Sequence, residues 1–135
     1  MQIVRLADRE SFITADGSEI RELAHPSWTE ARNQSLAEAT VEPGGQTAEH
    51  YHPRAEEIYH FTAGTGRMRL GAEEAEIRAG DCVVIPPGTT HKLWNTGGSL
   101  NSAMHAAATH TSASATDRRG SAKPFQPGAT AVGIR

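Results

Sequence analysis

Two histidines separated by one residue, His50 and His52, are the feature of this sequence best suited to chemistry. In a β-strand, residues i and i+2 point to the same face and lie roughly 6.5–7 Å apart. The two imidazoles can therefore lean onto one ion at the usual zinc–nitrogen distance of roughly 2.0–2.1 Å, while Tyr51 points away. Because histidine is a common transition-metal ligand, this spacing predicts part of a metal site.

A carboxylate follows the histidine pair after a short reversal at 53–55. On spacing alone, either Glu56 or Glu57 could serve as a ligand. Strand parity separates them, because Glu57 shares its face with Tyr59 and Phe61, and aromatic side chains should line an interior. We therefore expect Glu57 to point inward and Glu56 to lie in solvent.

His91 is the candidate for a fourth ligand from elsewhere in the sheet. It follows the rigid turn at 86–88, which reads Pro-Pro-Gly, and it begins a new predicted strand. A single histidine on a strand is more often a hydrogen-bonded or surface residue, so its residue type alone leaves this role open. The later histidines, His105 and His110, are expected to be incidental.

Short segments divided by turn signals surround these residues. Alternation over 35–42 predicts a half-buried strand that ends at 43–45, which reads Pro-Gly-Gly. The further predicted strands are 46–52, 56–62, 66–70, 75–78, 81–85 and 91–95. Gly and Pro recur too often between them for a helix of ordinary length. The pattern predicts an all-β fold, an antiparallel sandwich or barrel, with its core over 35–96.

The two ends of the chain differ from this core. Residues 1–34 hold two short alternating stretches, 3–6 and 19–23, which could form strands joined by a turn at 15–18. These strands could also provide a dimer contact by covering a sheet edge. Residues 97–135 are rich in Ala, Ser and Thr, and this composition predicts an irregular or flexible tail.

Composition narrows the function classes. At 135 residues and 14.4 kDa, one domain is expected. A net charge of −3 and scattered basic residues give no electrostatic case for binding nucleic acid or an anionic membrane. The first residues carry charges where a signal peptide needs an apolar core, and no run approaches the roughly 18 apolar residues of a membrane span. The single cysteine, Cys82, is expected to be buried, and a cytoplasmic location fits these features.

The wider spacing places the candidate residues in two motifs. The first, G-x5-H-x-H-x4-E-x6-G, is formed by Gly44, His50, His52, Glu57 and Gly64. The second, G-x5-P-x-G-x2-H-x3-N, is formed by Gly80, Pro86, Gly88, His91 and Asn95. Five fixed positions match by chance in roughly one start in a million. The two motifs closely resemble the signature motifs of the cupin superfamily, and the resemblance covers about residues 36–96.

This resemblance implies an antiparallel jelly-roll β-barrel that holds one divalent metal ion. The ligand positions of the family fall on His50, His52, Glu57 and His91. Asn95 takes the position of a structural hydrogen-bonding residue. The metal is expected to be Fe, Mn, Ni, Cu or Zn, because this donor set accepts all of them. Cupins usually add an apolar strand after the second motif, and since 101–111 is poor in branched apolar residues, an irregular last strand or one supplied by the N-terminus is expected.

The implied site suggests a function. Three neutral imidazoles and one carboxylate around a divalent ion leave a charge of about +1 and open coordination positions. The leading interpretation is a metal-dependent enzyme, with dioxygenase as the best single reaction and a small anionic or enolisable molecule as substrate. Glu57 and Tyr59 are the candidate catalytic residues, and Tyr59 also suits an interior wall beside Phe61.

Two other interpretations compete with the enzyme. A non-catalytic cupin that binds or senses a small ligand is favoured by the lack of a clearly placed general base besides the ligands. A structural cupin that has lost its metal is disfavoured by the retention of all four ligand positions. Small cupins commonly dimerise, so a homodimer is the expected assembly.

Overall fold

Nearly all regular structure in this computed structural model, which describes residues 1–98 and 103–111, is β-strand. The strands are β1 (Phe12–Ile13), β2 (Glu19–Ala24), β3 (Gln34–Val41), β4 (Glu57–Ala63), β5 (Thr65–Leu70), β6 (Glu73–Arg78), β7 (Cys82–Ile85), β8 (His91–Asn95) and β9 (Met104–Thr111). Within the described residues, helix is confined to one 3-10 turn, η1 (Leu6–Asp8). None of the helical structure described is long and apolar enough to cross a membrane.

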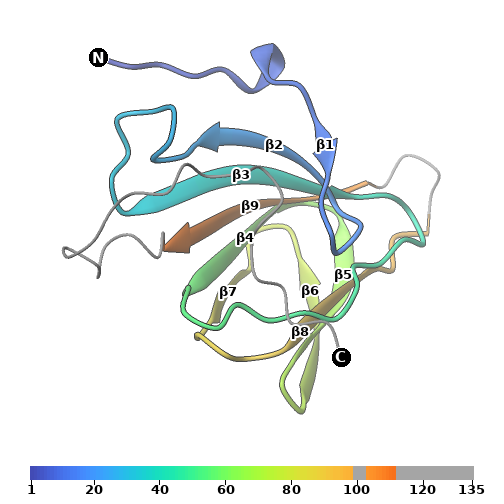
Figure 1. Ribbon diagram of the computed structural model, residues 1–135. Helices are drawn as coiled ribbons and strands as arrows, with labels where there is room; N and C mark the ends of the chain where they lie inside the picture. The colour runs from blue at the N-terminus through green and yellow to red at the C-terminus, as the bar shows by residue number, and fades with distance from the viewer. Residues whose placement is uncertain (99–102, 112–135) are drawn as a thin grey trace.

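The strands form two antiparallel sheets that face each other (Figure 1). The larger has the order β1-β2-β3-β9-β4-β7, and the smaller has the order β6-β5-β8. The buried apolar side chains that form the core are Val41, Tyr59, Phe61, Met68, Ile77, Ile85, Leu93, Met104, Ala106 and Ala108. This architecture confirms the predicted all-β jelly-roll class, built here as two sheets and not as one closed sheet.

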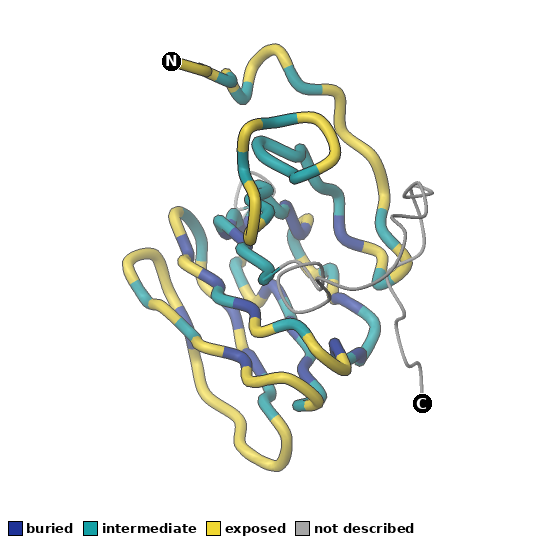
Figure 2. The backbone as a smooth tube through the Cα atoms, turned by 60° about the vertical axis from the view of Figure 1, so that its left-hand side comes forward, coloured by how far each residue is buried: buried dark blue, intermediate teal, exposed yellow. Residues whose placement is uncertain are grey.

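Strand parity explains how polar side chains enter this core. On β4, Glu57, Tyr59 and Phe61 are buried while the intervening His60 is exposed. The same alternation appears along the tube of Figure 2, where buried and exposed positions follow each other on the strands. Because successive side chains on a strand point to opposite faces, the apolar residues that hold β4 in the core also carry Glu57 inward.

Strand β9 corrects the prediction for the C-terminal region. The segment lies in the middle of the larger sheet, paired with β3 on one side and β4 on the other. The expectation that 97–135 forms an irregular or flexible tail is therefore wrong for Met104–Thr111, which completes the larger sheet from the C-terminal side. Most of the remaining residues of that prediction, 99–102 and 112–135, lie outside the described residues. Residues 97, 98 and 103 are described and belong to no strand.

Alanines on β9 explain why its sequence looked unlike a core strand. Ala106 and Ala108 are buried, and they lie opposite Phe61 and Tyr59 in the β4–β9 register. A small side chain opposite a large one keeps the layer filled without crowding. Alanine has a low intrinsic preference for strands, so packing against the neighbouring strands decides this segment.

The N-terminal prediction is correct for one of its two strands. Residues 19–23 lie in β2, but its hairpin partner is Phe12–Ile13, and 3–6 forms no strand. The turn between β1 and β2 is closed by a hydrogen bond from Thr14 N to Ser18 O, at 2.9 Å. With the turn closed at this point, Phe12–Ile13 lies opposite β2. Residues 3–6 are therefore too far from the turn to pair with β2.

The exposure of Cys82, the first residue of β7, also differs from the prediction. Cys82 is exposed, although its apolar surroundings in the sequence predicted burial. Along this edge strand, Val83 packs partly against the core and Ile85 is buried, so Cys82 and Val84 face outward. A continuous apolar run does not show which residues of a strand point inward, and here the pairing with β4 decides it.

Gly64, in the first motif, shows why the turn between β4 and β5 needs glycine. Its φ is +85°, a conformation that side chains rarely adopt. A Cβ built there would lie 2.9 Å from Met104 Cα, so the turn packs directly on β9. The glycine therefore permits both the turn and the close approach of the strand that carries the C-terminal part of the core.

Candidate metal centre

The segment that carries His50 and His52 leaves β3 and runs beside β8. The regular strand predicted over 46–52 is reduced to isolated bridges, of which His50–His91 joins the two motifs. His50 N donates to His91 O at 3.1 Å, and His91 N donates to His50 O at 2.9 Å. This backbone pairing brings the two rings to a centroid distance of 4.1 Å, so residues far apart in the sequence share one side of the site.

The turn at 86–88 ties the histidine segment to the start of β8. Gly88, at φ +77°, donates its backbone N–H to His52 O at 2.8 Å. Thr89 N donates to Pro86 O at 3.2 Å and closes the turn. Proline restricts φ at the first central position of this turn, and Gly88 supplies the positive φ at the second. The second motif therefore positions His52 as well as His91.

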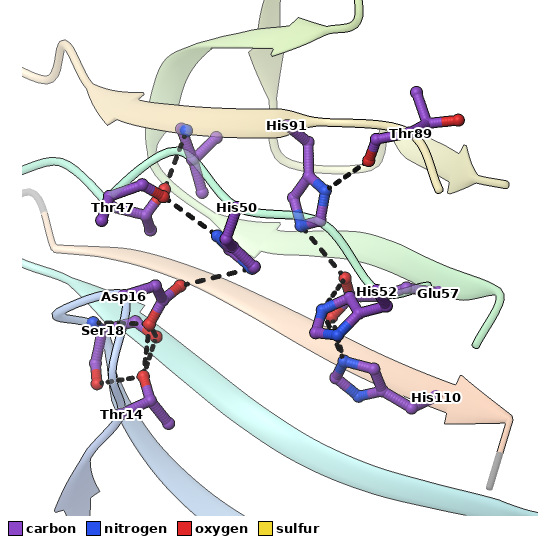
Figure 3. A network of polar contacts seen from close by, with 12 residues as sticks. Thr14, Asp16, Ser18, Thr47, His50, His52, Glu57, Thr89, His91 and His110 are labelled. Atoms are coloured by element: carbon purple, nitrogen blue, oxygen red, sulfur yellow. Dashed lines mark hydrogen bonds and ion pairs between the residues drawn. The ribbon is translucent and has the colours of Figure 1, made fainter. Parts of the chain in front are cut away.

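All four predicted ligands converge (Figure 3). Their candidate ligand atoms all lie within 4.8 Å of one another, and all four side chains are buried: His50, His52, Glu57 and His91. Glu57 Oε2 lies 3.2 Å from both His52 Nε2 and His91 Nε2. Glu56 is exposed, as strand parity predicted. The structure thus places the predicted donor set together, with Glu57 at its centre.

Backbone carbonyls orient two of the imidazoles. His50 Nδ1 lies 2.9 Å from Ala48 O, and His91 Nδ1 lies 3.2 Å from Thr89 O. A carbonyl oxygen only accepts hydrogen bonds, so each Nδ1 carries a proton, and in a neutral ring Nε2 then carries the lone pair. This is the arrangement in which a second partner fixes the tautomer of a metal-binding histidine.

Two polar atoms at the centre test whether the site suits a cation. Glu57 Oε2 and His91 Nε2 are buried, and neither has a hydrogen-bond partner within the described structure. The two atoms lie 3.2 Å apart, and leaving such groups without hydrogen bonds in a core is costly. A bound cation would satisfy both, so the residues present fit a divalent metal ion.

The electrostatics favour the metal-binding protonation states. Burial raises the pKa of Glu57, but contacts with His110, His52 and His91 outweigh burial and hold that pKa well below its usual range. Burial lowers the pKa of His50, and the neighbouring His91 and His52 lower it further, against the opposing effects of the hydrogen bond to Ala48 O and of Asp16. Glu57 is therefore a carboxylate and His50 a neutral imidazole, the forms that bind metals.

Tyr59 lies against the centre from the same face of β4 as Glu57. Its ring makes edge contacts with His91 and Phe61, at centroid distances of 5.9 and 6.1 Å. Burial raises the pKa of Tyr59, and the charges of Glu57 and Asp16 raise it further. The phenol therefore keeps its proton at neutral pH. Tyr59 is a wall residue of the core, and its catalytic role stays a prediction.

His110 is a site residue that the sequence analysis misjudged. Its Nε2 lies 2.8 Å from Glu57 Oε1 and 3.3 Å from His52 Nε2, so the prediction that it is incidental is wrong. His110 lies directly opposite Glu57 in the β4–β9 register and shares a face with the buried Ala108. Period-two alternation from Met104 would have indicated this face, had the segment been recognised as a strand.

Asp16 is a second site residue that no sequence pattern indicated. It lies in the turn between β1 and β2, and its side chain is 10% exposed. Its Oδ2 lies 3.8 Å from His50 Nε2 (Figure 3). A turn that reads Ala-Asp-Gly-Ser is ordinary for a hairpin, so only the folding of this hairpin over the histidine segment reveals the contact.

Asn95 takes the structural position that the resemblance implied. Its Nδ2 donates to Val41 O at 2.8 Å, and the residue is buried. Its Oδ1 accepts from Gly97 N at 2.9 Å. The side chain links the end of β8 to the end of β3 and lies outside the group of converging ligands.

Comparison with known proteins gives consistent results. Residues 37–104 match the family described as cupin domain (Cupin_2). The Methanocaldococcus jannaschii protein MJ1618, described as uncharacterized, is 49% identical over 86 residues, which are 64% of this chain and 69% of that protein. Polyketide synthase CurC of Streptomyces cyaneus is 31% identical over 81 residues, which are 60% of this chain and only 53% of CurC.

Solved structures share the fold. The polyketide cyclase RemF from Streptomyces resistomycificus superposes with a TM-score of 0.71 at 21% identity. The superposition covers 82% of this chain and 79% of RemF. At this identity the likeness shows a common architecture, and it extends over most of the two-sheet structure described above.

Proposed function

This chain belongs to the cupin domain family, and on that premise we propose that it is a metal-dependent enzyme acting on a small anionic or enolisable molecule. The observation that carries the proposal is the convergence of three imidazoles and one carboxylate within 4.8 Å. Glu57 Oε2 and His91 Nε2 are buried there without hydrogen-bond partners, which favours a site made for a cation over a merely structural cluster.

The chain's own residues prepare this site in three ways. Carbonyl oxygens of Ala48 and Thr89 fix the rings of His50 and His91 with their Nε2 atoms inward. His110 occupies Glu57 Oε1 and so leaves Oε2 free to face the imidazoles. A divalent ion held there would supply Lewis-acid or oxygen chemistry. These contacts preorganise the donors, which lowers the cost of gathering them around a cation.

Dioxygenation is the first reaction we propose within this class. Four protein donors would leave positions open on a six-coordinate ion. Two open positions are enough to accommodate a substrate oxygen and dioxygen together. Tyr59 contacts both His91 and Phe61, and an aromatic side chain beside the donors would suit an unsaturated or aromatic substrate.

A second candidate is a cyclisation that proceeds through an enol or enolate without dioxygen. The relatives favour it, because one is described as a polyketide synthase and one solved structure as a polyketide cyclase. Polyketide chains carry alternating carbonyl groups, which makes them enolisable. Asp16 and His110 lie beside the donor set and provide two groups able to hold a proton during such a reaction.

The experiment that tests the proposal loads the protein separately with Fe²⁺, Mn²⁺ and Zn²⁺ and keeps a metal-free sample as control. Each form is assayed with diketones, catechols, flavonols, oxalate and a linear polyketone, with and without dioxygen. Oxygen uptake that is lost in His52→Ala would support dioxygenation, and turnover without oxygen uptake would support cyclisation. Binding without turnover would favour the sensing alternative, and full activity without metal would overturn the proposal.

A further inference from the structure

Asp16 places a second carboxylate beside the candidate metal centre. Its Oδ2 lies 3.8 Å from His50 Nε2, the atom that His50 presents to the centre. Asp16 is outside both cupin motifs and outside the group of four converging ligands. It is therefore a neighbour of the site, and its charge is one that a bound small molecule would meet.

The turn between β1 and β2 decides which oxygen of Asp16 faces the centre. Oδ1 accepts hydrogen bonds from Thr14 Oγ1, from Ser18 N at 3.1 Å and from Ser18 Oγ at 2.8 Å. Three donors on one oxygen hold the carboxylate in place and leave Oδ2 free of them. In Figure 3, Oδ2 points from this turn toward His50.

A backbone contact fastens the same turn to the histidine segment. Ala48 N donates to Asp16 O at 2.6 Å, and Ala48 O in turn accepts from His50 Nδ1 at 2.9 Å. Asp16 and His50 are thus linked through one residue as well as facing each other directly. The backbone link and the hydrogen bonds to Oδ1 together hold Oδ2 in its position beside His50.

The charge of Asp16 changes the ligand class that the site suits. Three neutral imidazoles and Glu57 around a divalent ion leave a charge of about +1, which favours anions. Asp16 cancels that charge locally, and its Oδ2 repels a second negative charge at short range. A hydroxyl or N–H group on a ligand could instead donate to Oδ2, with the strength of a bond to an ionised acceptor.

We propose that Asp16 is a specificity-determining residue that selects ligands bearing a hydroxyl or N–H donor and rejects dicarboxylate dianions. The inference rests on the proposed metal-dependent function and narrows its substrate class. Within the small anionic or enolisable molecules considered above, it favours hydroxylated or enolic carbonyl compounds over oxalate-like dianions.

The test compares two probe ligands on the cobalt(II)-loaded protein at pH 7.5, by the visible absorption of cobalt. Oxalate is the dianion, and acetohydroxamate is the bidentate ligand with an N–H donor. Asp16→Asn removes the charge and keeps an acceptor oxygen for Thr14 and Ser18. Glu76→Gln, at an exposed position of β6, removes the same charge from a residue outside the donor set and is the matched control.

The expected result is a shift in preference. In D16N, the ratio of the Kd for oxalate to the Kd for acetohydroxamate should fall at least tenfold, while in E76Q it should stay within twofold of wild type. Ser18→Ala removes one donor to Oδ1 without changing the charge, and it should shift the ratio the same way by less. Ultrafiltration after each titration checks that cobalt remains on the protein.

Two contrary results are distinguishable. Cobalt binding with the same ligand preference in D16N and E76Q would overturn the role of Asp16 and leave the proposed function standing. Failure of the wild-type chain to bind cobalt or any other divalent ion would overturn the proposed function and the role of Asp16 with it.

Discussion

His110 Nε2 lies 2.8 Å from Glu57 Oε1, and the two residues stand directly opposite each other on β9 and β4. This contact explains how a carboxylate on β4 can present one oxygen to the imidazoles while its other oxygen is occupied. It also ties β9 to the candidate site, because the strand that completes the larger sheet carries the residue that contacts Glu57. The centre therefore depends on a segment that neither motif includes.

Removing the His110 imidazole should weaken metal binding without abolishing it. In His110→Ala, Glu57 Oε1 loses its partner and the carboxylate can rotate, so metal affinity should fall by roughly 10–100-fold, as is typical for residues that orient ligands. Competition with a chromogenic chelator measures the affinity. His60→Ala, on the exposed face of β4, is the control and should bind as wild type. Equal affinities for the two variants would contradict the orienting role.

The two adjacent glutamates should behave differently. Glu57→Gln removes the charged donor at the centre of the site, so its loss of metal affinity should exceed the roughly 10–100-fold expected for an orienting residue. Glu56→Gln changes an exposed side chain and should leave affinity unchanged. Metal content by elemental analysis after gel filtration separates the cases. If E56Q were the variant that lost its metal, the parity argument for β4 would fail.

Metal binding should stabilise the fold, because the centre is buried between the sheets and its donors are gathered only in the folded chain. At a free metal concentration 100 times the Kd, the gain is about 2.7 kcal/mol. For a domain of this size that corresponds to an increase in Tm of about 10 °C. Thermal unfolding with metal and with a chelator measures it. An unchanged Tm would argue against a metal site.

Acid should destabilise the metal-free protein in two steps. Burial lowers the pKa of His50 below 6.5. Burial raises the pKa of Glu57, but the contacts of Glu57 with three histidines outweigh burial and hold that pKa below 4.5. A group with a lowered folded-state pKa contributes stability above its unfolded pKa, and this is lost as the pH falls. The free energy of unfolding should therefore decline below about pH 6.5 and again below about 4.5.

Urea titrations in the presence of chelator, from pH 7.5 to 4, test this dependence. His50→Gln should lose the decline that begins near pH 6.5 and keep the later one. Stability that rose on acidification through this range would contradict the direction of both shifts.

Asn95 should matter for stability more than for metal binding. Asn95→Ala leaves Val41 O without its buried donor, which should lower the free energy of unfolding by about 1–3 kcal/mol. Asn33→Ala, at an exposed position, is the comparison and should change it little. Urea unfolding measures both, and metal stoichiometry should be the same in the two variants. A loss of metal confined to N95A would indicate a role in the site itself.

The sequence alone determined the donor set and the class of fold. The spacing of His50 and His52 follows from strand geometry, and the alternation of Glu57, Tyr59 and Phe61 indicates which glutamate faces inward. These are local relationships with a period of two, which a strand imposes whatever surrounds it. The local pattern predicted an antiparallel sandwich or barrel, and the resemblance of both motifs to those of cupins implied that His91 joins the other three side chains.

The tertiary structure decided which further residues reach the site. Asp16 and His110 are far from the motifs in sequence, and each contacts a predicted ligand because a hairpin or a strand packs beside it. Strand β9 is rich in alanine, and alanine becomes a core residue only where large side chains such as Phe61 lie opposite. Strand periodicity assigns faces within one strand, whereas contacts between strands and between a hairpin and the histidine segment come from long-range packing, which no local pattern records.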